Sequence, residues 1–548
     1  MSAPDRTVVP SIHPPTEPAR RRALKTIVGS VAAASLLSRT AAAATPANPA
    51  AVSAYPSLSL SHATQIVELP AWQLSALIHT KQVSCVEVME AYLAQIERVN
   101  PSVNAIVALH SRRACLLQAR QKDHALARGQ DQGWLHGFPQ AVKDLEATQG
   151  IPTTLGSPLY RDWVPKHDSL MVQRIKQAGA IIIGKTNTPE FGFGSHTYNP
   201  IYGATGNPYD PNKSAGGSSG GAACALAMRM QAVADGSDFM GSLRNPAGWC
   251  NVYGFRPSWG RVPATGEELF INEFGTQGPM ARSVPDLALL LATQSGHTPS
   301  VPASLPDEPR LKGLNPANAH ARLQANQAGK RIAWLADWDG YLPMSPDVLP
   351  VCQAALTTLG SLGLSVESIA APMDGETLWR DCWLPHRHFA ASGLKAFYDD
   401  PKKQALLKPE AQFEYAGSLN YSGADLYAAS VLRSQWYGIV QKLFEQFDYL
   451  VVPTAQCYPF AKTERWPQSI AGKAMDTYHR WMEVVTPWTL CGSPVVALPA
   501  GFNQQGLPMG IQVIGKPRHD FELLQLAYAY EQAQPLVANH PPPLALRP

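Results

Sequence analysis

Apolar runs typical of buried strands alternate along this chain with segments whose apolar residues recur at helical spacing. Residues 180–183 are an alanine followed by three isoleucines, which is typical of a buried strand, whereas the apolar residues of 70–98 recur at helical spacing until Asn100-Pro101. The same patterns predict further strands at 138–144, 331–336, 450–452, 496–500 and 509–515, and further helices at 112–128, 169–178, 222–234 and 284–294. This alternation predicts an α/β fold in which helices flank a central, mixed and twisted β-sheet.

The charge balance and the motif content argue against several classes of function. The 548 residues include 45 basic and 42 acidic side chains, so the formal net charge of +3 lacks the basic surplus of a nucleic-acid-binding protein. No run of about 18 strongly apolar residues predicts a transmembrane helix. The eight cysteines form no CxxC pair and no zinc-ligand spacing with a histidine, although one or two disulfides would suit an oxidising compartment. We therefore expect no nucleic-acid partner, no stable membrane association, no metal and no cofactor.

The first 69 residues are predicted to precede the folded domain. Arginines 20–22 and Leu24-Lys25 come before an apolar run at 26–37 and an alanine-rich stretch that ends at residue 44. This order is typical of a secretory signal peptide, and it resembles the twin-arginine type with Arg20 and Arg21 as the pair. A disordered basic tail or an uncleaved anchor is the alternative. We expect residues 1–44 to direct export to the bacterial periplasm or the medium, and residues 45–69 to form a linker.

Two familiar motifs occur without the structural context that they require. Residues 179–186 match GxxxxGK[ST], but their middle residues, one alanine and three isoleucines, favour a strand and not a phosphate-binding loop. Residues 216–220 match GxSxG, the pattern of α/β-hydrolases, in which the nucleophile directly follows a strand. The preceding residues 207–212 include two prolines and favour a turn-rich loop. We therefore expect neither a nucleotide site nor an α/β-hydrolase nucleophile.

Three other segments together contain the residue types that amide hydrolysis requires. Lys143 lies near the end of the strand at 138–144, Ser218 lies in the glycine- and serine-rich run 214–221, and Ser242 lies in residues 234–246. Hydrolysis of an amide needs a nucleophile, a base and a site that stabilises an oxyanion. Each segment alone has an ordinary explanation, such as a solvated lysine or a flexible loop, so the prediction depends on their combination.

This combination resembles the signature of the amidase signature family. That pattern runs from a lysine at a strand end through GGSSGG to G-[ST]-D-x-G-G-S-[IV]-R, and here the two serines lie 24 residues apart. Flanking runs at 184–187, 254–262, 278–283 and 506–512 also fit the family. The resemblance implies one large domain over 70–540, with a variable stretch at 297–445 that shapes the substrate pocket.

The resemblance also implies a Ser-cisSer-Lys triad. Ser242 would be the nucleophile that forms an acyl-enzyme, and Ser218, in a cis peptide bond, would relay a proton. Lys143 would be the base, which requires burial to lower its pKa. The implied supporting residues are the oxyanion-hole backbone of Phe239, Met240, Gly241 and Ser242, the structural residues Gly216, Gly217, Asp238 and Arg244, and the substrate-lining Asn187.

Two departures from the family pattern and one group of aromatic residues affect which substrate we expect. Met240 replaces the first of two family glycines, and Leu145 stands where many members have asparagine. Many aromatic residues lie between 380 and 490, and we expect them to favour an aryl or otherwise hydrophobic amide, with ordinary packing as the competing explanation. These residues are Trp383, Phe389, Phe397, Tyr398, Phe413, Tyr415, Tyr421, Tyr427, Trp436, Tyr458, Phe460, Trp466, Trp481 and Trp488.

The predicted function is hydrolysis of a small-molecule carboxylic amide to a carboxylate and an amine or ammonia, with esterase or carbamate hydrolysis as side activities. Two alternatives stay open. One is the amidotransferase role that some family members play on charged tRNA as part of a larger complex, which the export signal and the even charge disfavour. The other is a non-catalytic periplasmic binding protein on the same scaffold, which the complete set of catalytic residues disfavours.

Overall fold

The computed structural model describes residues 63–546, except for 267 and 272–273. The predicted signal at 1–44 and the linker up to residue 62 lie outside the described residues. The last part of the predicted linker forms a short 3-10 helix, η2 (Ala63–Glu68). Within the described ranges, no helix is both long and apolar enough to span a membrane.

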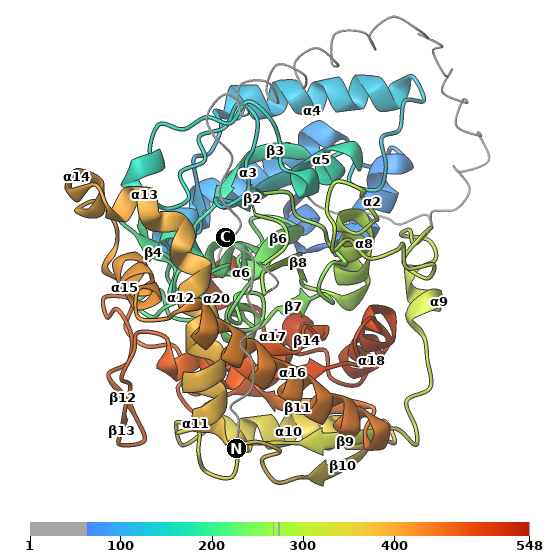
Figure 1. Cartoon of the computed structure of the whole chain (residues 1–548). Helices are drawn as coiled ribbons and strands as arrows, with labels where there is room; N and C mark the ends of the chain where they lie inside the picture. The colour runs from blue at the N-terminus through green and yellow to red at the C-terminus, as the bar shows by residue number, and fades with distance from the viewer. Residues whose placement is uncertain (1–62, 267, 272–273, 547–548) are drawn as a thin grey trace, which may run out of the picture. The chain divides into compact units, whose positions relative to one another are not determined.

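A mixed sheet of eight strands forms the centre of the described chain (Figure 1). Three neighbouring strands, β10, β9 and β11, run parallel, and the other neighbours pair antiparallel. This arrangement confirms the predicted mixed sheet. In spatial order the strands are β10 (Ser365–Ser368), β9 (Arg331–Trp334), β11 (Tyr449–Pro453), β15 (Pro508–Ile514), β14 (Val495–Phe502), β7 (Tyr253–Arg256), β8 (Thr276–Ala281) and β6 (Val233–Asp238).

A second sheet of three strands lies beside β6 and brings Lys143 to it. Strand β3 (Ile181–Thr186) is central, between antiparallel β1 (Ile106–Val107) and parallel β2 (Pro139–Lys143). The N–H group of Lys143 donates to Oδ2 of Asp235 on β6 at 3.0 Å. The lysine at the end of β2 therefore lies next to the end of β6. Because residues 181–186 form a buried strand, the rejection of a phosphate-binding loop there is confirmed.

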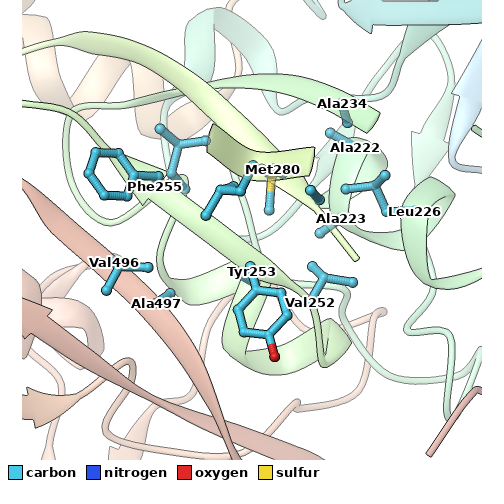
Figure 2. Close-up of a cluster of buried hydrophobic side chains, with 14 of the residues drawn as sticks. Ala222, Ala223, Leu226, Ala234, Val252, Tyr253, Phe255, Met280, Val496 and Ala497 are labelled. Carbon is cyan, nitrogen blue, oxygen red and sulfur yellow. The ribbon is translucent and has the colours of Figure 1, made fainter. Parts of the chain in front are cut away.

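Small side chains let helix α6 (Gly220–Ala227) pack closely on the eight-stranded sheet. Ala222, Ala223 and Leu226 are fully buried, and they lie beside Ala234 of β6 and Met280 of β8 (Figure 2). Burial of apolar surface stabilises such a layer by about 25 cal/mol per Å². This packing fixes the start of α6, and with it the serine run that precedes it.

Helices cover the sheet, as the alternation of patterns predicts (Figure 1). Helix α8 packs on β8, α10 on β14 and β15, and α18 on α8 and β14. The principal helices are α2 (Ala71–His79), α3 (Cys85–Val103), α4 (Arg112–Ala127), α5 (Leu170–Gln177), α7 (Asn245–Cys250), α8 (Val284–Gln294), α10 (Val348–Ser361), α12 (Leu384–Phe389), α15 (Pro409–Ser418), α16 (Gly423–Gln446), α17 (Thr486–Leu490) and α18 (Asp520–Ala533).

Two predicted helices have different bounds in the structure. The helix expected at 70–98 is two helices, because Lys81 adopts a left-handed conformation and Ser84 caps a new helix with Glu87. That second helix continues past Pro101 to Val103. The helix expected at 222–234 ends at Ala227, since Arg229 is left-handed, and strand β6 begins at Val233.

Candidate active site

Lys143 is fully buried at the end of β2 and contacts three serine side chains. Its Nζ donates to Ser218 Oγ at 2.7 Å, to Ser219 Oγ at 2.8 Å and to Ser237 Oγ at 3.0 Å. Burial lowers the pKa of Lys143 to about 7, because desolvation disfavours the charged ammonium. A fraction of this lysine is therefore a free base at neutral pH.

Ser218 lies in a backbone turn that the neighbouring glycines shape. The Gly217–Ser218 peptide bond is cis, and Gly216 has a φ of +77°. The Gly217 N–H donates to Asn245 Oδ1 at 3.2 Å, and a Cβ added at Gly216 would lie 2.5 Å from the same oxygen. A side chain at Gly216 would therefore collide with the start of α7, and a Cβ at Gly217 would lie 3.0 Å from the backbone of Ser195 and His196. In the part of the chain that the structure describes, no strand directly precedes this serine, which agrees with the rejection of an α/β-hydrolase nucleophile.

Ser242 and Ser218 both line one cavity of about 260 Å³. The serines are 5% and 3% exposed, so the cavity is their only evident approach within the described residues. Ser242 Oγ makes no hydrogen bond within that part of the chain, while Ser218 Oγ receives the Lys143 bond. Catalytic hydrogen bonds often reach their full strength only in the complex with substrate.

Asp238 holds the loop that leads to Ser242. Arg244 binds both carboxylate oxygens of Asp238 at 2.9 Å, and Arg256 Nη1 lies 3.1 Å from Oδ1. Although burial opposes ionisation, the two guanidinium groups hold the pKa of Asp238 well below its usual value. Asp238, Arg244 and Arg256 thus form a buried charge network in front of Ser242.

The oxyanion-hole prediction needs one correction. The Gly241 N–H donates to Asp238 Oδ1 at 2.9 Å, so this donor is already engaged. No hydrogen bond within the described residues engages the N–H groups of Phe239, Met240 or Ser242. These three groups remain as candidate donors, and Phe239 and Met240 line the cavity.

Asn187, the one residue expected to line the substrate site, does not line the cavity. Asn187 is buried away from the cavity, where Nδ2 donates to Thr205 Oγ1 at 3.0 Å and to Gly203 O at 3.2 Å. None of the fourteen aromatic residues noted between 380 and 490 lines the cavity, which favours the competing explanation that they serve ordinary packing. Some lie directly behind its wall, since Phe397 stacks on Phe191 with ring centroids 6.3 Å apart. The aromatic lining instead consists of Phe191, Phe193, Phe239 and Tyr478.

The sequence did not predict several polar residues of the site. Ser219 is next to Ser218 in the same run, so its position in the sequence could have predicted its contact with Lys143. Arg387, on α12, and Tyr478 line the cavity, and both interact with buried Glu414 on α15. Arg387 lies within the predicted variable stretch 297–445, but no sequence pattern distinguishes it there. Leu145, which stands where many family members have asparagine, also lines the cavity.

Buried lysine, hydroxyl groups and free backbone N–H groups around one cavity define a serine hydrolase type of site. Comparison with known proteins gives the family. The Amidase family model matches residues 87–524. The chain therefore belongs to the amidase signature family, and this membership supports hydrolysis of a C–N bond.

Relatives with different substrates share this fold. A glutamyl-tRNA(Gln) amidotransferase subunit from a Cyanothece species is 33% identical over 494 residues, which cover 86% of this chain and 98% of the relative. A bacterial aryl acylamidase structure superposes with a TM-score of 0.80 at 27% identity, covering 88% of this chain and 99% of that one. The structure of 6-aminohexanoate cyclic dimer hydrolase gives a TM-score of 0.74 at 26% identity, covering 87% and 99%.

Proposed function

We propose that this chain hydrolyses an aryl or otherwise hydrophobic carboxylic amide to a carboxylate and an amine or ammonia. One observation carries the proposal. Lys143, fully buried, lies 2.7 Å from Ser218 in the wall of a cavity that Ser242 also lines. The aromatic lining of that cavity favours a substrate with apolar surface.

In the proposed mechanism, Ser242 attacks the amide carbonyl. Ser218 accepts the Ser242 proton and passes its own proton to neutral Lys143. The N–H groups of Phe239, Met240 and Ser242 stabilise the negative charge that develops on the carbonyl oxygen. The relay then runs in reverse and protonates the leaving amine. Ser218 and Lys143 next take a proton from a water molecule as it attacks the acyl-enzyme. The relay returns a proton to Ser242, and the carboxylate is released.

The test uses a chromogenic 4-nitroanilide and a fluorophosphonate probe. We expect the wild type to release nitroaniline and to be labelled at Ser242, and the Ser242→Ala variant to do neither. Ser195→Ala is the matched control, because Ser195 lines the same cavity but lies outside the proposed relay. Labelling that persists in Ser242→Ala would rule out this nucleophile. A wild type that binds amides without labelling or turnover would instead support a binding protein.

A second candidate is a role within a tRNA-dependent amidotransferase, which the 33% identity over 98% of the amidotransferase relative favours. The nearly even charge and the predicted export signal disfavour it. Co-purification from the source cell separates the candidates. We expect the mature chain to purify without partner proteins and without tRNA, and a stable complex with either would favour the amidotransferase.

A further inference from the structure

Arg387 places a buried guanidinium group in the wall of the cavity. Its side chain is 6% exposed, and Nε donates to Glu414 Oε1 at 2.8 Å. Nη2 donates to the Tyr478 hydroxyl at 3.0 Å. These contacts fix two of the three nitrogen atoms, so the orientation of the planar group is set before any substrate enters.

Two aromatic rings hold the same group next to the proposed reaction centre. The guanidinium carbon lies 4.8 Å from the centroid of the Phe193 ring and 5.0 Å from that of Phe239. Cation–π contacts of this kind are attractive and directional. Phe239 is also one of the proposed oxyanion donors. A substrate whose carbonyl reaches Ser242 therefore comes close to Arg387.

The third nitrogen, Nη1, has no hydrogen-bond partner within the described part of the chain. An arginine offers five N–H donors, and leaving donors unpaired in a desolvated site is unfavourable. Since Arg387 lines the cavity, its free donors are available to a bound molecule. The site thus contains a rigid donor that the proposed hydrolytic relay does not use.

The surrounding charges determine which acceptor suits this donor. The negative charge of Glu414 already neutralises the positive charge of Arg387. Although burial opposes ionisation, the arginine holds the pKa of Glu414 well below its usual value. His388 Nδ1 lies 3.0 Å from Glu414 Oε2, and burial lowers the pKa of the neighbouring His479 to about 3, which keeps it neutral. A substrate carboxylate bound by Arg387 would bring a second negative charge to a guanidinium group whose charge Glu414 already neutralises. A neutral oxygen needs only the donor.

We infer that Arg387 is a specificity-determining residue that binds a second, neutral oxygen acceptor of the substrate, such as a ketone or amide carbonyl. This inference rests on the proposed amidase function. It narrows the substrate class to hydrophobic amides that carry a carbonyl group near the scissile bond. The hydrogen bond forms from Nη1, while Nε and Nη2 keep their contacts with Glu414 and Tyr478.

Matched 4-nitroanilides test the inference on the wild type. The acyl groups are 3-oxobutanoyl, 4-oxopentanoyl and 5-oxohexanoyl, each compared with the chain of equal length without the ketone, and with succinyl as the anionic analogue. We expect kcat/KM for at least one ketone to exceed that of its methylene partner by about tenfold or more, since a site with a buried donor rejects analogues that lack the acceptor. No preference at any position, or a preference for succinyl, would overturn the inference.

Variants then assign the preference to Arg387. In Arg387→Met/Glu414→Gln both charges of the ion pair are removed, so neither of the two groups is left buried without its partner. We expect the ketone preference to fall to about onefold while the methylene substrate is still hydrolysed. Arg387→Lys keeps the charge without the planar fork and is expected to lose most of the preference. Arg331→Met/Glu367→Gln, which removes an exposed Arg–Glu pair that does not line the cavity, is the control and should retain the preference.

The outcomes separate this inference from the proposed function. An equal loss of kcat/KM on ketone and methylene substrates would mean that Arg387 only supports Phe239, and would overturn the inference. Fluorophosphonate labelling of Ser242 with turnover but no ketone preference would do the same and leave the amidase proposal standing. No labelling and no turnover of any anilide by the wild type would remove both.

Discussion

At the scale of single residues, burial changes the chemistry of Lys143. A lysine in water holds its proton up to a pH of about 10.4. Lys143 is fully enclosed, and among the described residues its nitrogen contacts only neutral hydroxyl and carbonyl oxygens at hydrogen-bond distance. Three acidic residues nearby, Glu146, Asp235 and Asp238, partly offset the desolvation, and the result is a pKa of about 7. A side chain that is usually a cation is therefore placed to accept a proton.

This pKa predicts the pH dependence of hydrolysis. Because the relay needs the free base, kcat/KM should rise with pH through about 7 and fall about tenfold per unit below it. Lys143→Met should lower kcat/KM by about a thousandfold or more, and the permanently charged Lys143→Arg should be as inactive. The rate of fluorophosphonate labelling, measured over the same pH range, checks that the profile belongs to the enzyme. A flat profile between pH 5 and 8 would contradict the role of Lys143 as the base.

At the scale of elements, the start of α6 is pressed against the end of β3. A Cβ added at Gly221 would lie 2.4 Å from the backbone nitrogen of Asn187 and 2.5 Å from its carbonyl oxygen. Neither atom can move without displacing the chain that follows β3. The glycine is therefore required by the approach of two backbones, and the same approach holds Ser218 beside Lys143.

Gly221→Ala is accordingly expected to destabilise the fold. We expect a loss of about 1–3 kcal/mol or more from overpacking, seen as a lower Tm in a thermal melt followed by circular dichroism. The matched control is Gly438→Ala, in the exposed interior of α16, where an added Cβ meets nothing within 4 Å. That change should raise stability by about 0.5–1 kcal/mol. Equal Tm values for the two variants would show that the approach of α6 to β3 is not tight.

At the scale of the whole molecule, the core encloses all the cysteines. The eight thiols are free and buried, and they come from segments between Cys85 and Cys491. Burial raises the pKa of several of them, including Cys85 and Cys224. Thiolate is the reactive form, so these groups are doubly protected from oxidation. The domain therefore needs no disulfide, which would suit a chain that folds before export.

Thiol titration tests this arrangement. We expect a chromogenic disulfide reagent to detect close to none of the thiols in the native protein and about eight after unfolding in guanidinium chloride without reductant, because every Sγ is enclosed. A sample treated with reductant before unfolding and then desalted is the control. Fewer than eight thiols in the untreated sample would reveal a disulfide and contradict the structure.

The sequence by itself determined those features that depend on local pattern. Strands such as β3 and helices such as α8 follow from runs of apolar residues with a fixed period, and the structure confirms them within one to three residues. Lys143, Ser218 and Ser242 lie in segments whose order and spacing distinguish the family. Local pattern was less successful at element ends, where Lys81 and Arg229 adopt left-handed conformations that no neighbouring residue predicts.

Only the tertiary structure decided which residues meet around the cavity. Arg387, Glu414 and Tyr478 come from three separate segments of the chain, and each is an ordinary polar residue in its own segment. Asn187 lies in a segment that fits the family, yet its amide nitrogen donates to oxygens of Gly203 and Thr205, away from the cavity. Gly241 has the expected place in the loop, but Asp238 takes its N–H. Hydrogen bonds and burial join residues through space, and one-dimensional spacing does not encode those distances.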